Sequence, residues 1–162
     1  MTTEATIEIR SVINGTPFTS AVAPRLTVAE YLRDDLGLTG TKTSCEMEVC
    51  GVCSVLVDDR PVSACAALAC DLDGTTVTTV EGLAGDSSLS HLQQAFIERF
   101  ASQCGFCTPG FLVMATALLA ENPDPTHQEV AHYLEGNICR CTGYRPIIEA
   151  VLLAAERMRG DE

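Results

Sequence analysis

Cysteine is the residue type with the most chemistry to explain in this sequence, because nine cysteines occur among 162 residues. Thiolates bind metal ions and iron–sulfur clusters, form disulfides or act as nucleophiles. An odd number of cysteines cannot pair completely within one chain. The first residues, Met1 to Glu4, show neither the basic nor the apolar stretch of a secretory signal. We therefore expect a cytoplasmic protein whose thiols stay reduced.

Four cysteines form a first group, in which three lie close together and a fourth follows at a distance: Cys45, Cys50, Cys53 and Cys65. The spacing C-x4-C-x2-C with a distant fourth cysteine is typical of plant-type [2Fe–2S] clusters. Small residues beside these cysteines, such as Gly51 and Ser54, let the backbone approach closely and point amide groups at the sulfurs. Zinc is usually bound by two C-x2-C or Cys/His knuckles, so it fits this loop less well.

Two cysteine pairs form a second group: Cys104, Cys107, Cys139 and Cys141. The first pair directly precedes a predicted helix, whose N-terminal dipole and free N–H groups would favour the thiolate and lower its pKa. The second pair lies in the joint between two further predicted helices. Spacing alone leaves zinc and an iron–sulfur cluster open here, because C-x-C is unusual for both.

The remaining candidate ligands are isolated. Cys70 stands alone and is predicted to pack as a small apolar side chain. The three histidines have no partner at metal-ligand spacing, and we expect them to be solvated or hydrogen-bonded on helices: His91, His127 and His132.

The charge balance excludes some partners. The chain carries 22 acidic and 10 basic residues, a formal net charge of −12, which repels nucleic acids and anionic membranes. No apolar run approaches the roughly 20 residues needed to span a bilayer. We therefore expect no nucleic-acid partner and no transmembrane segment, and the acidic surface is predicted mainly to keep the protein soluble.

The first half of the chain is predicted to be rich in β-structure. Residues 5–22 should form a hairpin, because polar and apolar residues alternate and Asn14-Gly15 is typical of a type I′ turn. Thr27 and Glu30 form a capping box for a short helix that ends near Gly37. The later segments of this half are the cysteine loop over residues 39–53, strands over 54–57 and 75–80, and a turn at Asp58-Asp59.

After about residue 82 the pattern becomes helical. Apolar residues at helical spacing predict a first helix: Leu89, Leu92, Phe96 and Phe100. Pro109 begins a second helix that ends at Asn122-Pro123, and Thr126 with Glu129 forms a capping box for a third, which ends near Glu135. A fourth helix begins near Pro146. With a hinge over residues 82–88, we expect two small domains.

Two parts of the sequence carry a resemblance to a known family. Gly40-Thr41-Lys42 and the following Cys45–Cys53 segment resemble the cluster loop of the small iron–sulfur subunits of molybdenum hydroxylases, the xanthine oxidase family. The segments from Gln103 to Gly110 and from Gly136 to Tyr144 resemble that family's second signature, in the same order and at a similar separation. The resemblance covers nearly the whole chain.

This resemblance implies an α+β chain with two domains. A β-grasp, plant ferredoxin-like domain over residues 1–82 would precede a four-helix-bundle domain over residues 83–162, and each would bind one [2Fe–2S] cluster. The implied ligands of the outer cluster are Cys45, Cys50, Cys53 and Cys65. The implied ligands of the inner cluster are Cys104, Cys107, Cys139 and Cys141.

The resemblance also implies partners. In the family the inner cluster lies beside the molybdopterin cofactor, to which the positions of Gln103 and Cys141 hydrogen-bond. A glutamine amide both donates and accepts, as a pterin edge requires; a cap at the start of the following helix is the alternative. The implied partners are a large molybdopterin-binding subunit and a medium FAD-binding subunit, assembled as a dimer of heterotrimers.

The implied function is electron transfer. The chain would relay electrons from the molybdopterin site through two [2Fe–2S] clusters to a flavin subunit or another acceptor, as a subunit of an oxidoreductase that has no catalytic residue of its own. Aldehydes, N-heterocycles, acyl-CoA thioesters and carbon monoxide are all oxidised by members of the family, and the residues of this chain do not select among them.

Four residues near the ligands modify this expectation. Family members commonly have glycine at the positions of Ser44 and Glu48, and we expect these two departures to tune the shape and potential of the loop. Arg140 and Arg145 flank the inner ligands, where a positive charge would raise the reduction potential of an anionic cluster. Salt bridges within the helical half are the alternative role of the two arginines.

Two functions of other classes remain open on the sequence. A free-standing ferredoxin-like carrier would account for the first cysteine group but not for the second group or Gln103. A zinc-stabilised interaction module would account for a compact chain but fits the C-x4-C-x2-C loop poorly.

Overall fold

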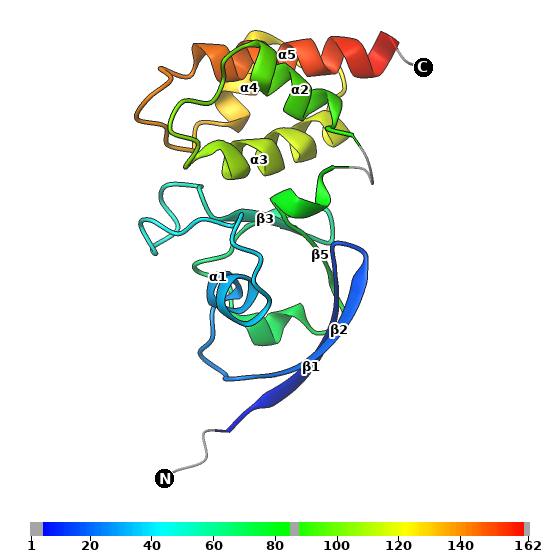
Figure 1. Cartoon of the computed structure of the whole chain (residues 1–162), viewed down its shortest axis with the longest axis vertical. Coiled ribbons are helices and arrows are strands. Elements are labelled where there is room, and N and C mark those ends of the chain that lie inside the picture. The colour runs from blue at the N-terminus through cyan, green and yellow to red at the C-terminus, as the bar shows by residue number, and fades with distance from the viewer. Residues whose placement is uncertain (1–4, 85–87, 161–162) are drawn as a thin grey trace.

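The structure is a computed structural model that describes residues 5–84 and 88–160. A β-rich first half and a helical second half lie one on the other (Figure 1). The fold is α+β, as predicted. The predicted hinge over residues 82–88 lies partly outside the described residues, which leave out 85–87.

The N-terminal hairpin forms as its alternating pattern predicts. Its strands are β1 (Ile7–Ile13) and β2 (Thr16–Val22). They pair antiparallel with Ile7 opposite Val22. Asn14 and Gly15 between them have φ angles of 49° and 79°, the left-handed conformation that a type I′ turn requires.

Three more strands complete the sheet: β3 (Ser54–Val57), β4 (Arg60–Ser63) and β5 (Thr76–Thr78). The strand order is β2-β1-β5-β3-β4, with β1 and β5 parallel and the other neighbours antiparallel. Asp58 and Asp59, with φ angles of 47° and 62°, form the predicted turn. The sequence analysis did not predict β4, because Pro61 weakens the strand signal. At a sheet edge, however, the missing N–H of a proline costs no ladder hydrogen bond.

A short helix packs against one face of this sheet (Figure 1). Its α-helical part, α1 (Val28–Glu30), continues as a π-helical segment, Tyr31–Asp35. The predicted capping box is present, since the Glu30 N–H donates to Thr27 Oγ1 at 3.2 Å and the Thr27 N–H donates to Glu30 Oε2 at 2.9 Å. Short 3-10 turns at Ala69–Leu72 and Val80–Gly82 complete this half. The arrangement is the expected β-grasp.

Four helices form the described part of the second half: α2 (His91–Glu98), α3 (Thr108–Glu121), α4 (His127–Tyr133) and α5 (Arg145–Gly160). The capping box of Thr126 and Glu129 is present. One detail of the prediction is wrong. Leu89 and Phe100 lie outside α2, and Phe100 has a φ of 52° and is 81% exposed, because the helix ends before it reaches that residue.

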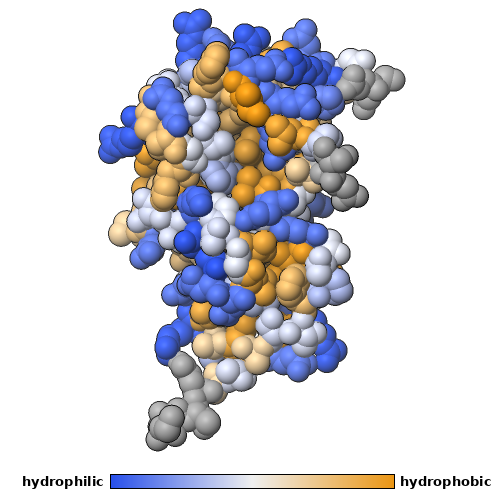
Figure 2. Space-filling view, in the orientation of Figure 1, coloured by the Kyte–Doolittle hydropathy of each residue, from blue (hydrophilic) through white to orange (hydrophobic). Residues whose placement is uncertain are grey.

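The two halves share a buried junction. α3 is apolar on nearly all sides because it packs against β3 and β4 as well as the other three helices. Leu56 of β3 forms a small buried cluster with Val113 and Ala117 of α3. Figure 2 shows apolar residues on both sides of this junction and hydrophilic residues over the helical end. No helix in the described part of the chain is both long and apolar enough for a membrane span.

Candidate metal centres

The first cysteine group, here called the outer thiol group (Cys45, Cys50, Cys53 and Cys65), is positioned by a loop with left-handed turns. Glu46, Glu48 and Gly51 have φ angles of 55°, 58° and 67°. These turns aim backbone amides at one sulfur, and the Val49 N–H donates to Cys45 Sγ at 3.4 Å. Hydrogen bonds from the amides of Met47, Val49 and Cys50 lower the pKa of Cys45 to about 6. The loop therefore stabilises a thiolate.

The outer thiols form two pairs. Cys45 lies beside Cys50, and Cys53 lies beside Cys65, so that the two thiols of each pair affect each other's ionisation. Burial raises the pKa of Cys53 to about 11, because its side chain is only 2% exposed. A buried thiolate at this position therefore needs a cationic partner.

The second group, here called the inner thiol group (Cys104, Cys107, Cys139 and Cys141), also forms two pairs. Cys104 and Cys141 are exposed, and their sulfurs lie 3.5 Å apart. Cys107 and Cys139 are buried and lie beside each other. All four side chains line one cavity of about 290 Å³, together with Cys50 of the outer thiol group.

The helix N-terminus does not lower the pKa of Cys107, contrary to the sequence-based prediction. Cys107 is the N-cap residue of α3, but its side chain makes no capping hydrogen bond. Burial, followed by the neighbouring Cys139 thiol, raises its pKa to about 12. Desolvation therefore outweighs the helix dipole here.

Side chains from the loop before α5 support Cys139. The Thr142 hydroxyl donates to Cys139 Sγ at 3.1 Å. Burial acts to raise the pKa of Cys139, but hydrogen bonds from Thr142 and from the Cys141 amide outweigh it, and the pKa is lowered. The Cys139 N–H donates to the Tyr144 hydroxyl at 3.2 Å, and the Tyr144 ring packs edge-on against Phe111 of α3 with the ring centroids 6.4 Å apart.

Both thiol groups fit a [2Fe–2S] cluster by the chemistry of their donors. Each group contains only sulfur ligands, and its two pairs match two iron atoms that each take two thiolates. Within the described ranges, no three Cys, His, Asp or Glu side chains converge as they would around a single metal ion. A cluster would also neutralise the buried thiolates of Cys53 and Cys107, which burial alone disfavours.

The other residues considered in the sequence differ in their distance from the thiol groups. Gln103 is exposed beside Cys104, and Arg140 is exposed and lines the cavity of the inner thiol group. Arg145 instead pairs with Glu149, with Nε 2.7 Å from Oε1, which is the alternative role considered for it. Cys70 packs partly buried against the core of the β-rich half and lies in neither thiol group.

Glu48 and Ser44, at positions where the family commonly has glycine, lie in different structural environments. Glu48 has a φ of 58°, a conformation that costs glycine nothing and other residues about 1 kcal/mol or more. This explains why glycine is common at that position. Ser44 lines the cavity of the inner thiol group, so it lies between the two groups.

Sequence reasoning did not single out three residues that organise the inner loop. Asn137 is polar but only 3% exposed, while Thr142 and Tyr144 make the contacts to Cys139 described above. The sequence feature that could have indicated them is the presence of polar residues close to the ligands Cys139 and Cys141, in a segment that is not expected to form a helix.

Comparison with known proteins matches both halves of the chain. A 2Fe-2S iron-sulfur cluster binding domain model matches residues 11–84, and a [2Fe-2S] binding domain model matches residues 79–152. The nicotine 6-hydroxylase small subunit of Paenarthrobacter nicotinovorans is 52% identical over 90% of this chain and 88% of that protein. The nicotinate dehydrogenase small FeS subunit of Eubacterium barkeri is 44% identical over 93% of this chain and 96% of that protein.

A solved structure agrees with these relatives. A chain of quinoline 2-oxidoreductase from Pseudomonas putida 86 has a TM-score of 0.93 and 45% identity to this chain, and the match covers 98% of this chain and 99% of that one. The similarity extends over both thiol groups. A one-cluster carrier and a zinc-stabilised module, the two alternatives from the sequence, are therefore not favoured.

Proposed function

Because the chain belongs to the small [2Fe–2S] iron–sulfur subunits of molybdenum hydroxylases, the xanthine oxidase family, we propose that its two thiol groups each bind one [2Fe–2S] cluster. The outer thiol group would bind the outer cluster and the inner thiol group the inner cluster. The observation that carries this assignment is the cavity lined by all four inner thiols and Cys50. Bound clusters supply one-electron redox chemistry, and the chain supplies thiolates, hydrogen bonds to sulfur and a fixed separation.

We propose the division at residues 82 and 83 as the functional boundary between two cluster-binding domains. The outer thiols lie before this boundary and the inner thiols after it. The buried junction of β3 with α3 supports a fixed arrangement of the two domains. No residue of either domain is proposed to act as an acid, base or nucleophile, so the contribution of the chain to the reaction is conduction.

The exposed edge of the inner thiol group is proposed to face a large molybdopterin-binding subunit. Gln103, Cys104 and Cys141 are exposed there, whereas Cys107 and Cys139 are buried. Gln103 would hydrogen-bond to the pterin through its amide, and Cys141 would both bind the cluster and contact the pterin. Exposure at this edge is what such a contact requires.

On the other side, the outer thiol group is proposed to pass electrons to FAD in a medium subunit, within a dimer of heterotrimers in the cytoplasm. Eight cysteines that act as cluster ligands must be thiolates, which a reducing compartment favours. The loop side chains of Met47 and Val49 are 69% and 57% exposed, so apolar surface for a protein contact lies beside this thiol group.

We propose a nitrogen heteroaromatic compound as the substrate class of the whole complex. The three compared proteins are named for nicotine, nicotinate and quinoline, each of which contains such a ring. The test is hydroxylation by the native complex, with pyridine and quinoline compounds compared against aldehydes. Turnover of aldehydes alone would refute this substrate class and leave the electron-transfer role intact.

The electron-transfer role is tested by isolating the native complex and measuring iron, molybdenum and flavin together with electron paramagnetic resonance (EPR) spectra. We expect two distinct [2Fe–2S] signals after dithionite reduction and a large subunit that co-purifies. A single cluster signal, or a colourless zinc protein, would overturn the proposal.

A further inference from the structure

One main-chain hydrogen bond connects the two thiol groups. The Ile138 N–H donates to the Cys50 carbonyl oxygen at 2.9 Å. Ile138 directly precedes Cys139, so the bond joins the backbone beside an inner thiol to the backbone of an outer thiol. Cys50, Cys107 and Cys139 also lie in one buried core cluster. The two groups are thus in contact through protein atoms.

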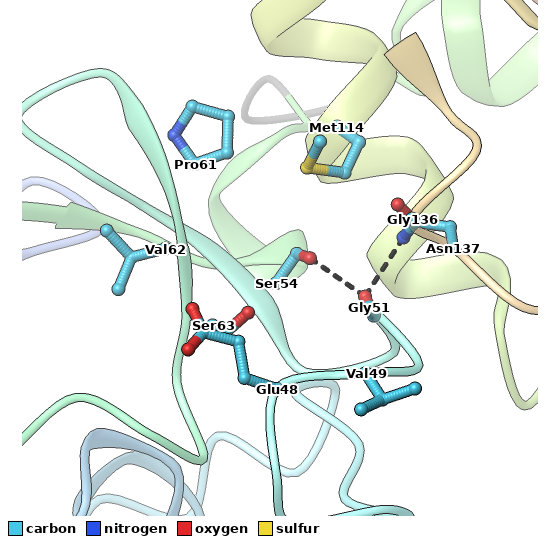
Figure 3. A pocket seen from close by; sticks show the side chains of 10 residues that line it. All are labelled: Glu48, Val49, Gly51, Ser54, Pro61, Val62, Ser63, Met114, Gly136 and Asn137. Atoms are coloured by element: carbon cyan, nitrogen blue, oxygen red, sulfur yellow. Dashed lines mark hydrogen bonds between the residues drawn. The ribbon is translucent and has the colours of Figure 1, made fainter. Parts of the chain in front are cut away.

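Asn137 supports this connection from the neighbouring position. Its side chain is buried, and Nδ2 donates to the Gly51 carbonyl oxygen at 2.9 Å. The Ser54 hydroxyl donates to the same oxygen at 2.8 Å. Figure 3 shows both bonds converging on Gly51. Two successive carbonyls of the outer loop, those of Cys50 and Gly51, are therefore held by two successive residues of the inner loop.

The packing at this point leaves no room for a side chain on either of two glycines. A Cβ atom on Gly51, which has a φ of 67°, would lie 2.7 Å from Cγ of Asn137. A Cβ atom on Gly110, in the first turn of α3, would collide with the Gly51 carbonyl oxygen and lie 3.0 Å from Cα of Val52. The outer loop, the start of α3 and the inner loop therefore meet at backbone contact distance.

We propose that Asn137, together with Gly51 and Gly110, forms a positioning node that holds the Ile138–Cys50 hydrogen bond and thereby sets the electronic coupling between the two clusters. Electron transfer depends steeply on separation and on the bonds that connect donor and acceptor. A path for the electron through this hydrogen bond connects the two cysteine loops directly. A path through packed side chains would have to cross gaps between atoms that are not bonded. The node holds this bond in place because the buried Asn137 amide is hydrogen-bonded, and because Gly51 and Gly110, which have no side chains, let the loops pack at backbone contact distance.

The inference rests on the proposed binding of two clusters and assigns Asn137 a role separate from ligation. A purely structural Asn137 would affect stability when removed but would leave the coupling unchanged in molecules that keep both clusters. A positioning Asn137 would affect the coupling in those same molecules. The two roles are distinguished by measuring the coupling itself.

The experiment uses the full chain isolated with both clusters and compares Asn137→Ala with Asn14→Ala. Asn14 is the control, because its side-chain amide likewise bonds to a residue far along the chain, Thr79, through two hydrogen bonds of 2.9 Å each, and it belongs to neither cysteine loop. Three quantities are measured: iron content, the spin–spin splitting of the fully reduced EPR spectrum, and the rate of electron transfer between the clusters after a reducing pulse.

We expect Asn137→Ala to keep both EPR signals, to reduce the splitting and to slow the transfer several-fold, whereas Asn14→Ala changes neither quantity. An unchanged splitting and rate in Asn137→Ala would overturn the inference. If that variant loses a cluster, the same measurements on Asn137→Ser decide: its polar atom is one bond closer to the main chain than the amide nitrogen of Asn137, which weakens or removes the bond to the Gly51 carbonyl, and wild-type coupling there would overturn the inference. Absence of two clusters in the wild-type chain would instead contradict the proposed function.

Discussion

The donors at the outer thiol group are main-chain amides, whereas the inner thiol group combines main-chain amides with a side-chain hydroxyl. Left-handed turns at Glu46, Glu48 and Gly51 point main-chain amides at Cys45. In the inner loop, the hydroxyl of Thr142 donates to the sulfur of Cys139. Main-chain donors survive substitution as long as the loop keeps its conformation, whereas side-chain donors do not. We therefore expect the donors of the outer loop to depend on its conformation, and one donor of the inner loop to depend on the identity of Thr142.

The two groups also differ in where they are buried. In the inner group one pair of thiols is exposed and the other is buried in the helical core. In the outer group Cys53 lies in the core of the β-rich half, while Cys50 belongs to the helical core. Residues of the outer loop, Cys50 and Val52, are thus packed in the core of the other half, so the two sites are expected to be separable in ligation but linked in position.

The largest expected effect is the loss of one cluster at a time. Cys45→Ala should remove the outer cluster and Cys104→Ala the inner one, because each removes one of four ligands. Iron content should fall to about half in each variant, and a different EPR signal should disappear in each. Cys70→Ala is the control and should keep both signals. Loss of both clusters in either single variant would show that the sites are not separable.

The next effect tests how the helical core supports the inner site. Phe111 is 1% exposed and packs against Tyr144, so Phe111→Ala should lower the free energy of unfolding by about 3–5 kcal/mol. The inner EPR signal should disappear at lower denaturant concentration than the outer one. Ile97→Ala, at a residue 63% exposed, should change the unfolding free energy by less than about 0.5 kcal/mol. Simultaneous loss of both signals would contradict separate support.

A smaller effect tests the side-chain donor. Thr142→Val removes the hydroxyl that donates to Cys139 Sγ. Because hydrogen bonds to sulfur stabilise the reduced cluster, the inner midpoint potential should fall by roughly 40 mV, the equivalent of about 1 kcal/mol for one electron. The outer potential should not move. Thr116→Val, whose hydroxyl donates to the Leu112 carbonyl at 2.8 Å, is the matched control and should shift neither potential.

The smallest effect concerns charge beside the inner site. Arg140→Gln should lower the inner midpoint potential by less than Thr142→Val does, because an exposed charge is screened by water and salt. Arg145→Gln should shift it less still, since Arg145 is paired with Glu149. The shift for Arg140 should shrink as ionic strength rises. An unchanged inner midpoint potential in Arg140→Gln at low ionic strength would show that the charge of Arg140 does not affect this cluster.

Local sequence signals predicted the elements that carry the cysteines. The turn at Asn14-Gly15 and the capping boxes at Thr27 and Thr126 formed as expected, because each depends on a few neighbouring residues. β4 was missed because its pairing with β3, rather than its own residues, makes it a strand. The pKa of Cys107 was predicted in the wrong direction because burial, a tertiary property, outweighs the helix N-terminus.

Ligand spacing and helix capping are local properties, so the two sets of cysteines and the elements that present them follow from short segments of the chain. The pairing of the thiols, the exposure of one inner pair, and the bonds from Asn137 and Ile138 to Gly51 and Cys50 depend on tertiary packing. Asn137 and Gly51 lie 86 positions apart in the chain. Contacts of that kind depend on the packing of α3 between the two halves, which no short segment of sequence encodes.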